Sequence, residues 1–265
     1  MPYSQVTLLR WDAAAALGAD VAITTRHGGV SRPPYDSLNL GLHVGDDPDA
    51  VVANRRRAAQ AFGVDLAELV FARQVHGADV TSVGATDGGR GATADDDAVA
   101  EADVLVTRGP GVTAVIMVAD CVPLALVDPV ARVLAAVHAG WRGTAAGVAG
   151  AALDAMAERG AHRERIRAFV GPAVAPERYQ VTDEVALAVA DAIGPVALEP
   201  EVARPDAPGH WLVDLAAANR QQLRLGGVQD EHIDGCGVST ADERFFSDRA
   251  ARPCGRFALL ARLVD

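Results

Sequence analysis

The feature that most constrains this chain is a set of short apolar segments between residues 112 and 143, which end in polar or reactive residues. Val112 to Ala119 is rich in β-branched residues, has the length of a buried strand, and stops abruptly before a polar pair that ends in Cys121. Val133 to Val137 has the same character and is followed by His138. If these two strands are neighbours, Cys121 and His138 meet at one edge of a sheet.

The rest of the chain shows alternating strand and helix patterns without a fixed repeat or a linker, which predicts one α+β domain over residues 1–265 with mixed sheets flanked by helices. Further strands are predicted at Val6–Arg10, Val21–Thr25, Leu69–Phe71, Asp79–Val83, Ala102–Thr107, Leu124–Val127 and Ile166–Val170. Helices are predicted from Pro48 to Phe62, from just after Thr144 to about Arg159, at Glu184–Ala192 and at Val213–Leu225, and a proline-rich connection at Leu198–His210.

Composition excludes several classes of protein. The chain has 265 residues, a formal net charge of −11 and a pI near 5.0, which argues against a general partner for nucleic acids or acidic membranes, since both require a basic face. Three cysteines without a Cys-x-x-Cys pair do not suggest a disulfide scaffold. No apolar run approaches the roughly 18 residues of a membrane span, so a cytoplasmic location is expected.

Three residues that follow strands have the chemistry of a metal centre. His76, Cys121 and His138 are 45 and 17 residues apart, which is too far for a finger-type structural zinc site. A catalytic zinc site instead uses three ligands from separate strand ends and leaves one position open, and thiolate and imidazole both suit zinc. On the residues alone, the alternative is a buried structural cysteine with two unrelated histidines.

Several short motifs follow one another along nearly the whole chain: Thr25-Arg26-His27-Gly28-Gly29, Leu38-Asn39-Leu40-Gly41, His43-Val44-Gly45-Asp46-Asp47-Pro48, Asn54-Arg55, Gln74-Val75-His76-Gly77, Ala102-Asp103, Ala119-Asp120-Cys121-Val122-Pro123 and Val137-His138-Ala139-Gly140-Trp141-Arg142-Gly143. In these motifs and in their order the chain resembles the purine nucleoside phosphorylases formerly called multicopper polyphenol oxidases or laccases, a family that also includes the bacterial peptidoglycan editing factor. The match weakens near the end, where Asp248 stands in a segment that usually reads Phe-Phe-Ser-Tyr-Arg.

The resemblance implies a fold, a metal and an activity. The fold is expected to be similar to the cytotoxic necrotizing factor-like cysteine hydrolase fold, and His76, Cys121 and His138 are expected to be zinc ligands, with copper as the alternative metal. The implied reactions are phosphorolysis of adenosine, inosine and guanosine, with methylthioadenosine as a further candidate substrate, and deamination of adenosine. Zinc suits deamination because it lowers the pKa of a bound water toward about 7.

The expected catalytic residues are Cys121, His138 and Asp120. Asp120 is either a base or a group that orients a ligand, and the alternative is a hydrogen-bonded carboxylate at a strand end. Phosphorolysis requires an anion site beside the sugar, for which the candidates are Arg55, Arg26 and the backbone amides of residues 140–143 at a helix start. The full set of expected substrate-binding residues is Arg55, Arg26, Asn39, Gln74 and Arg142.

Two other functions remain open at this stage, and the oligomeric state is not indicated. In a cysteine hydrolase that edits a peptidoglycan precursor, Cys121 is the nucleophile and His138 its base. In a copper-dependent polyphenol oxidase, the metals are coppers. The oxidase is disfavoured because blue-copper and trinuclear sites together require many histidines, and the chain has only seven in all.

Overall fold

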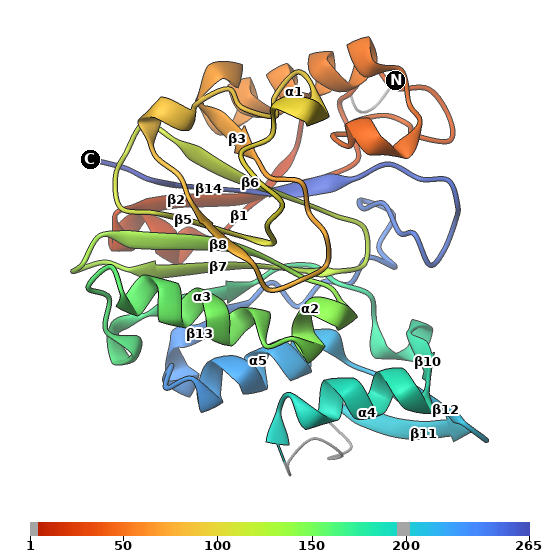
Figure 1. Cartoon of the computed structure of the whole chain (residues 1–265). Helices are drawn as coiled ribbons and strands as arrows, with labels where there is room; N and C mark the ends of the chain where they lie inside the picture. The colour runs from red at the N-terminus through yellow and green to blue at the C-terminus, as the bar shows by residue number, and fades with distance from the viewer. Residues whose placement is uncertain (1–4, 195–201) are drawn as a thin grey trace.

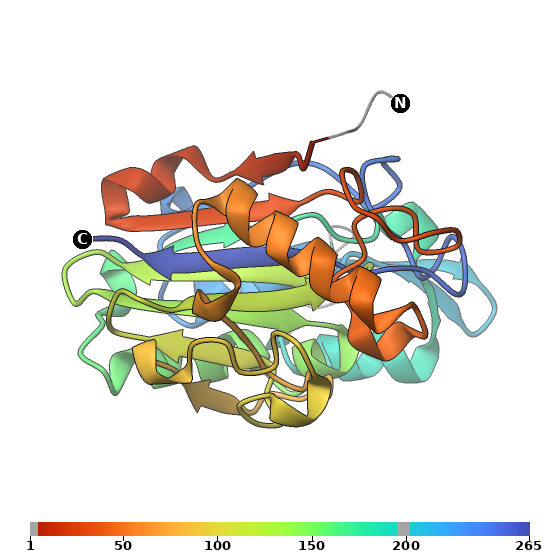
Figure 2. The same cartoon turned by 90° about the horizontal axis from the view of Figure 1, so that it is seen from above.

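The computed structural model describes residues 5–194 and 202–265. Within these ranges the chain has an α+β architecture, as the sequence predicts. Two large β-sheets lie face to face, helices cover both outer faces, and a small third sheet lies beside the helices at one end (Figures 1 and 2). No helix in these ranges is long and apolar enough to cross a membrane.

The first sheet is mostly antiparallel; within the described residues, β3 and β6 form its one parallel pair. Its strand order is β1 (Leu8–Arg10), β2 (Ala19–Thr24), β14 (Phe257–Leu263), β6 (Thr113–Val118) and β3 (Leu69–Phe71). The C-terminal strand β14 therefore pairs with both β2 and β6 and lies in the middle of this sheet. Strand β14 was not among the predicted elements.

The second sheet is mixed and is built around the antiparallel pair of β7 and β8. Its order is β13 (Ile233–Gly235), β9 (Arg167–Val170), β7 (Val122–Asp128), β8 (Val133–Ala139), β5 (Val104–Thr107) and β4 (Val80–Ser82). Every residue of β7 and β8 is buried, because one face of this sheet packs on the first sheet and the other on helices.

Strand alternation divides the core into layers. In β6, Ile116 and Val118 face the layer between the two sheets, whereas Val115 and Met117 face outward toward α1. The same rule applies to β8, where Leu134 and Ala136 face the layer between the sheets and their neighbours face the helices.

Five α-helices are present in the described ranges. Helix α1 covers the first sheet; its N-terminus is capped by the Asp47 carboxylate, which accepts a hydrogen bond from the Asp49 amide, and Gly63 ends it with a φ of 91°. Helices α3 and α5 cover the second sheet, and α4 packs on the small sheet (Figure 1). The helices are α1 (Pro48–Phe62), α2 (Trp141–Ala145), α3 (Val148–Ala157), α4 (Asp183–Asp191) and α5 (Leu215–Leu225).

Two predicted segments differ from the structure. The helix expected from just after Thr144 to about Arg159 is interrupted between α2 and α3, because Gly147 has a φ of 77°, outside the right-handed helical region. The connection predicted at Leu198–His210 lies partly outside the described residues. Its described part contains β11 (Ala203–Ala207) and the start of β12 (His210–Val213), which form the small sheet with β10 (Gln180–Thr182).

Candidate metal centre and cavity

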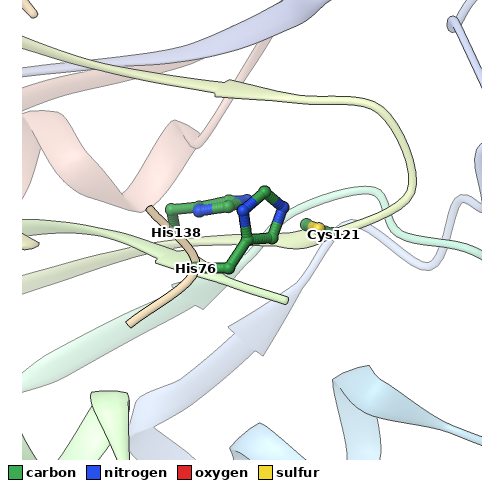
Figure 3. A group of neighbouring side chains, drawn as sticks. All are labelled: His76, Cys121 and His138. Carbon is green, nitrogen blue, oxygen red and sulfur yellow. The ribbon is translucent and has the colours of Figure 1, made fainter. Parts of the chain in front are cut away.

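His76, Cys121 and His138 come together at one end of the two sheets (Figure 3). Their donor atoms all lie within 4.8 Å of one another, and the two imidazole rings meet edge to face with their centroids 4.7 Å apart. His138 is buried, whereas Cys121 is half-buried and His76 is exposed toward a cavity. The three residues predicted as metal ligands therefore form one cluster with an open side.

The route by which the cluster forms differs from the prediction. The strand before Cys121 is β6 and the strand that contains His138 is β8; the two belong to different sheets and are not paired with each other. The chain crosses from the first sheet to the second between β6 and β7, and Cys121 lies on this crossing. Because β7 pairs with β8 so that Pro123 lies opposite His138, the crossing delivers Cys121 to the end of β8.

One buried carboxylate holds both histidines. Asp103, which is completely buried, has its Oδ1 2.7 Å from His138 Nδ1. Its two oxygens also accept hydrogen bonds from the amides of Val75, His76 and Gly77, and these amides hold His76 at a φ of 62°. Since a carboxylate only accepts here, His138 Nδ1 carries the hydrogen and Nε2 is left as a donor atom for a metal. Asp103 was quoted in a motif but was not assigned a role from the sequence.

Cys121 and His138 each favour the charged form of the other. Burial by itself raises the pKa of Cys121, but the charge and hydrogen bonds of His138 and His76 outweigh burial and lower that pKa to about 6. Burial lowers the pKa of His138, but the Cys121 thiolate and Asp103 outweigh it and raise that pKa to about 9. A thiolate beside imidazoles, one of them backed by a carboxylate, is a donor set for a metal such as zinc or for thiol chemistry.

A cavity of about 610 Å³ opens over the cluster. Phe71, Met117 and Val118 give it an apolar wall, while arginines give it positive charge. A cavity of this volume fits a ligand of nucleoside size. Of the predicted substrate-binding residues, Gln74 and Arg142 line it, although both amide ends of Gln74 are bonded to the backbone of Met117.

Asp120 is fully engaged by the chain itself. Its carboxylate accepts hydrogen bonds from the hydroxyls of Thr240 and Ser247 and from the Arg249 amide. Its φ is 86°, and its carbonyl accepts from the Val174 amide. The structure thus favours the alternative in which Asp120 is a hydrogen-bonded carboxylate at a strand end, which fixes the loop after β13 beside Cys121.

Arg55 is not among the residues that line the cavity. Its side chain is completely buried in α1 and donates hydrogen bonds to the carbonyls of Leu40, Gly91 and Ala92, with its Cζ 3.9 Å from the centroid of the Phe71 ring. Burial lowers its pKa to about 10, so the guanidinium is still charged at neutral pH. The expectation that Arg55 binds phosphate is not supported by this position, because its donors are used inside the core.

We expect Arg55→Leu to lower the free energy of unfolding by about 3 kcal/mol, because it leaves three buried carbonyls without a donor. Chemical denaturation measures the change. The adjacent exposed Arg56→Leu is the matched control, with an expected change below about 0.5 kcal/mol. A stable Arg55→Leu protein that needs much more phosphate for activity would restore the original expectation.

Arg26 and Asn39 also use their side chains for hydrogen bonds within the fold. Arg26 donates to the Asp36 carbonyl at 2.9 and 2.8 Å, and its guanidinium lies 4.5 Å from the centroid of the Phe246 ring. Asn39 is completely buried and is bonded to the backbone of Gly41 and Arg256. Neither residue is among those that line the cavity.

Tyr179 and Arg249 are among the cavity residues to which the sequence assigned no role. Tyr179 follows a short turn after β9, and Arg249 lies in the irregular chain before β14, so neither is next to the central motifs in sequence. The hydrogen bond from the Arg249 amide to Asp120 is what brings that distant segment to the site. Only this long-range contact reveals its place.

Comparison with known proteins agrees with the motif order. The family model described as "Multi-copper polyphenol oxidoreductase laccase" matches residues 20–264. The chain belongs to this family. Relatives in it carry the name purine nucleoside phosphorylase, which confirms the resemblance drawn from the motifs. ORF3 of Streptomyces griseus is 44% identical over 91% of this chain and 92% of its own length, and YlmD of Geobacillus stearothermophilus is 42% identical over 92% and 89%.

Solved structures of this laccase-like family have the same fold. The crystal structure of YlmD from Geobacillus stearothermophilus superimposes with a TM-score of 0.90 at 39% identity, covering 97% of this chain and 96% of that one. The Bacillus licheniformis protein YfiH gives a TM-score of 0.90 at 33% identity with the same coverage. The α+β arrangement is therefore shared along almost the whole length of these family members.

Proposed function

We propose that this protein is a zinc-dependent purine nucleoside phosphorylase that also deaminates adenosine. The observation that carries the proposal is the His76, Cys121 and His138 cluster, which faces a cavity of nucleoside size with apolar and cationic walls. The names of relatives at 42–44% identity support the same activity. Adenosine, inosine and guanosine are the proposed nucleosides, methylthioadenosine is a further candidate, and phosphate is the co-substrate.

The donor set fits zinc. Two imidazoles and one thiolate are borderline-soft ligands, and three protein ligands with an open fourth side are typical of catalytic zinc. When bound, zinc supplies a Lewis acid at this position and lowers the pKa of water. Asp103 holds His138 in the tautomer that presents Nε2, which is the arrangement of a carboxylate–histidine–metal triad.

Gly140 leaves the space that the metal and its ligands require. A Cβ at this position lies 3.0 Å from both Cys121 Sγ and His76 Cδ2. The backbone there has a φ of −77°, which any residue adopts, so alanine acts only through these contacts. We expect Gly140→Ala to weaken zinc binding about tenfold or more, as measured by competition with a chelator.

Gly150→Ala is the matched control, since nothing lies within 4 Å of a Cβ there and the residue is inside α3. It is expected to leave zinc binding unchanged and to raise stability by about 0.5–1 kcal/mol. Unchanged zinc affinity in Gly140→Ala would contradict the proposal that zinc binding requires the space beside Gly140.

The proposed phosphorolysis exchanges one bond for another. A phosphate oxygen forms a bond to the sugar C1′ while the bond from C1′ to the purine N9 breaks, the electron pair leaves on the base, and the base takes up a proton. The products are ribose 1-phosphate and the free purine. The residues of this chain contribute by holding the nucleoside in the cavity, excluding water and binding the anion.

Purified protein incubated with inosine and phosphate tests this function. Hypoxanthine and ribose 1-phosphate should form together and only when phosphate is present, and adenosine should also give inosine. Hypoxanthine released at the same rate without phosphate indicates a hydrolase. No turnover of any of the three nucleosides by zinc-loaded protein contradicts the proposal.

A second candidate is the cysteine hydrolase, with Cys121 as the nucleophile and His138 as its base. It is favoured by one observation, the chain of Cys121, His138 and Asp103, in which a thiolate with a pKa near 6 contacts an imidazole oriented by a carboxylate. Copper oxidation is less well supported: among the described residues, this one cluster has the donors and spacing for a metal, whereas multicopper oxidases need several centres.

A further inference from the structure

The arginines around the cavity differ in how their charge is used. Five arginines line it: Arg73, Arg142, Arg249, Arg252 and Arg256. Arg73 pairs with Glu101, and Arg252 and Arg256 both pair with Asp248. No carboxylate in residues 5–194 or 202–265 lies within 4.0 Å of Arg142 or Arg249. The positive charges of these two arginines are therefore not paired with a carboxylate and can interact with an anionic ligand.

Arg249 is held at the metal end of the cavity. Its backbone amide donates a hydrogen bond to the carboxylate of Asp120 at 2.6 Å, and Asp120 directly precedes Cys121 in the sequence. Its guanidinium lies 5.0 Å from the centroid of the Tyr179 ring, and Nη2 donates to the Gln180 carbonyl at 3.3 Å. The remaining guanidinium donors have no partner within the described residues, so they are available to an anion.

Arg142 reaches the same cavity from α2. It follows β8 and Gly140 by a few residues, is exposed, and lies 4.4 Å from the centroid of the Trp141 ring without donating a hydrogen bond to any described residue. Because α2 has only five residues, the arginine side chain and not the helix terminus is the cation at this place.

Tyr179 lines the same cavity as both arginines and the cluster. Burial raises its pKa to about 12, as does the Cys121 charge, while the charges of Arg249 and Arg142 oppose the rise. Its hydroxyl thus stays protonated at neutral pH and makes no hydrogen bond within the described part of the chain. A free hydroxyl donor near two unpaired guanidiniums beside a metal cluster suits an oxyanion.

We propose that Arg142 and Arg249 hold the phosphate co-substrate, with the Tyr179 hydroxyl as a third donor. This inference rests on the proposed phosphorolysis and names the residues that serve it in place of Arg55 and Arg26. Arg252 and Arg256 are left out of the proposed phosphate site, because the carboxylate of Asp248 pairs with both of them. A chain with net charge −11 needs such a local concentration of positive charge to bind a dianion.

The test compares KM values for the two substrates. Arg249→Met and Arg142→Met should each raise KM for phosphate by about tenfold or more, and leave KM for inosine and the zinc content within about twofold of wild type. Arg249→Lys should lose less, because the charge remains. Neither side chain is buried and the Arg249 amide remains, so both variants should fold.

Arg252→Met is the matched control, since it removes the same charge from the same cavity but its arginine is paired with Asp248. Its KM for phosphate should change less than about twofold. An equal rise in the control, or a rise in both KM values of Arg249→Met, overturns the assignment.

Phosphate binding can also be measured without turnover, by the ³¹P line width of inorganic phosphate titrated with zinc-loaded protein. Weaker binding in Arg249→Met than in Arg252→Met supports the site even if no nucleoside is cleaved, in which case only the proposed function fails. If wild type, Arg249→Met and Arg252→Met bind phosphate equally well, the proposed phosphate site is wrong even if phosphorolysis is observed.

Discussion

Cys121→Ala is expected to abolish zinc binding and to lower kcat/KM for inosine phosphorolysis by more than about a hundredfold. Losing a group that merely orients a metal ligand costs about 10–100-fold, so losing a ligand should cost more. His76→Ala and His138→Ala should behave in the same way, since all three donor atoms belong to one cluster. Elemental analysis and an inosine assay on the same samples measure both effects.

Cys236→Ala is the matched control, because this cysteine is also half-buried but lies outside the cluster. It should retain one zinc per chain and full activity. Full zinc content in Cys121→Ala would remove Cys121 from the ligands, and stoichiometric copper in protein taken from cells would revive the oxidase.

The reactivity of Cys121 separates metal binding from thiol catalysis. In metal-free protein its low pKa makes it mainly thiolate at pH 7.5, so iodoacetamide should modify it rapidly, whereas bound zinc should protect it. Peptide mapping by mass spectrometry distinguishes it from Cys236 and Cys254. Rapid alkylation of zinc-loaded protein, together with full activity after chelation, favours the cysteine hydrolase.

Asp103→Asn is expected to have the second largest effect, because one residue positions two ligands. Asparagine keeps one acceptor oxygen in place of two, so it cannot serve both His138 and the amides of residues 75–77. We expect zinc affinity to fall about 10–100-fold and the free energy of unfolding to fall by about 3 kcal/mol. The exposed Asp79→Asn is the control and should change neither quantity appreciably.

The same carboxylate predicts a pH dependence for the metal-free protein. Burial raises the pKa of Asp103, but the hydrogen bond and charge of His138 and the amides of Gly77 and His76 outweigh it, so its pKa is lowered overall. A lowered pKa contributes stability that is present above the unfolded value of about 3.9 and lost as the pH falls through the folded value. Asp103→Asn should therefore lose less stability than wild type on acidification below about pH 4. Parallel losses in the two proteins contradict this role.

Much of the local structure followed from the sequence, because it depends on neighbouring residues. The start of α1 at Pro48 follows from the Asp47 cap, and β3 from a short apolar run. The cluster of His76, Cys121 and His138 was also predicted, since reactive residues after strands and the family motifs both indicated it. These signals are short in range, so they can be read from sequence.

The sequence left open which arginine serves the core and which faces the cavity. Arg55 is part of a family motif, but its partners are carbonyls 15 to 37 residues away, and their distance in space is set by packing. Arg249 is far from the central motifs and reaches the cavity through Asp120. Only the three-dimensional contacts show whether the guanidinium of an arginine is hydrogen-bonded inside the core or is available to bind a ligand.

The sequence by itself determined the α+β character, the family and the three residues of the cluster. Only the tertiary structure showed that β6 and β8 belong to different sheets and that Cys121 lies where the chain crosses between them. It alone placed β14 in the middle of the first sheet and Asp103 behind both histidines. The physical reason is that sheet membership and buried hydrogen bonds are contacts between distant residues, whereas apolar periodicity reports only the surroundings of each segment.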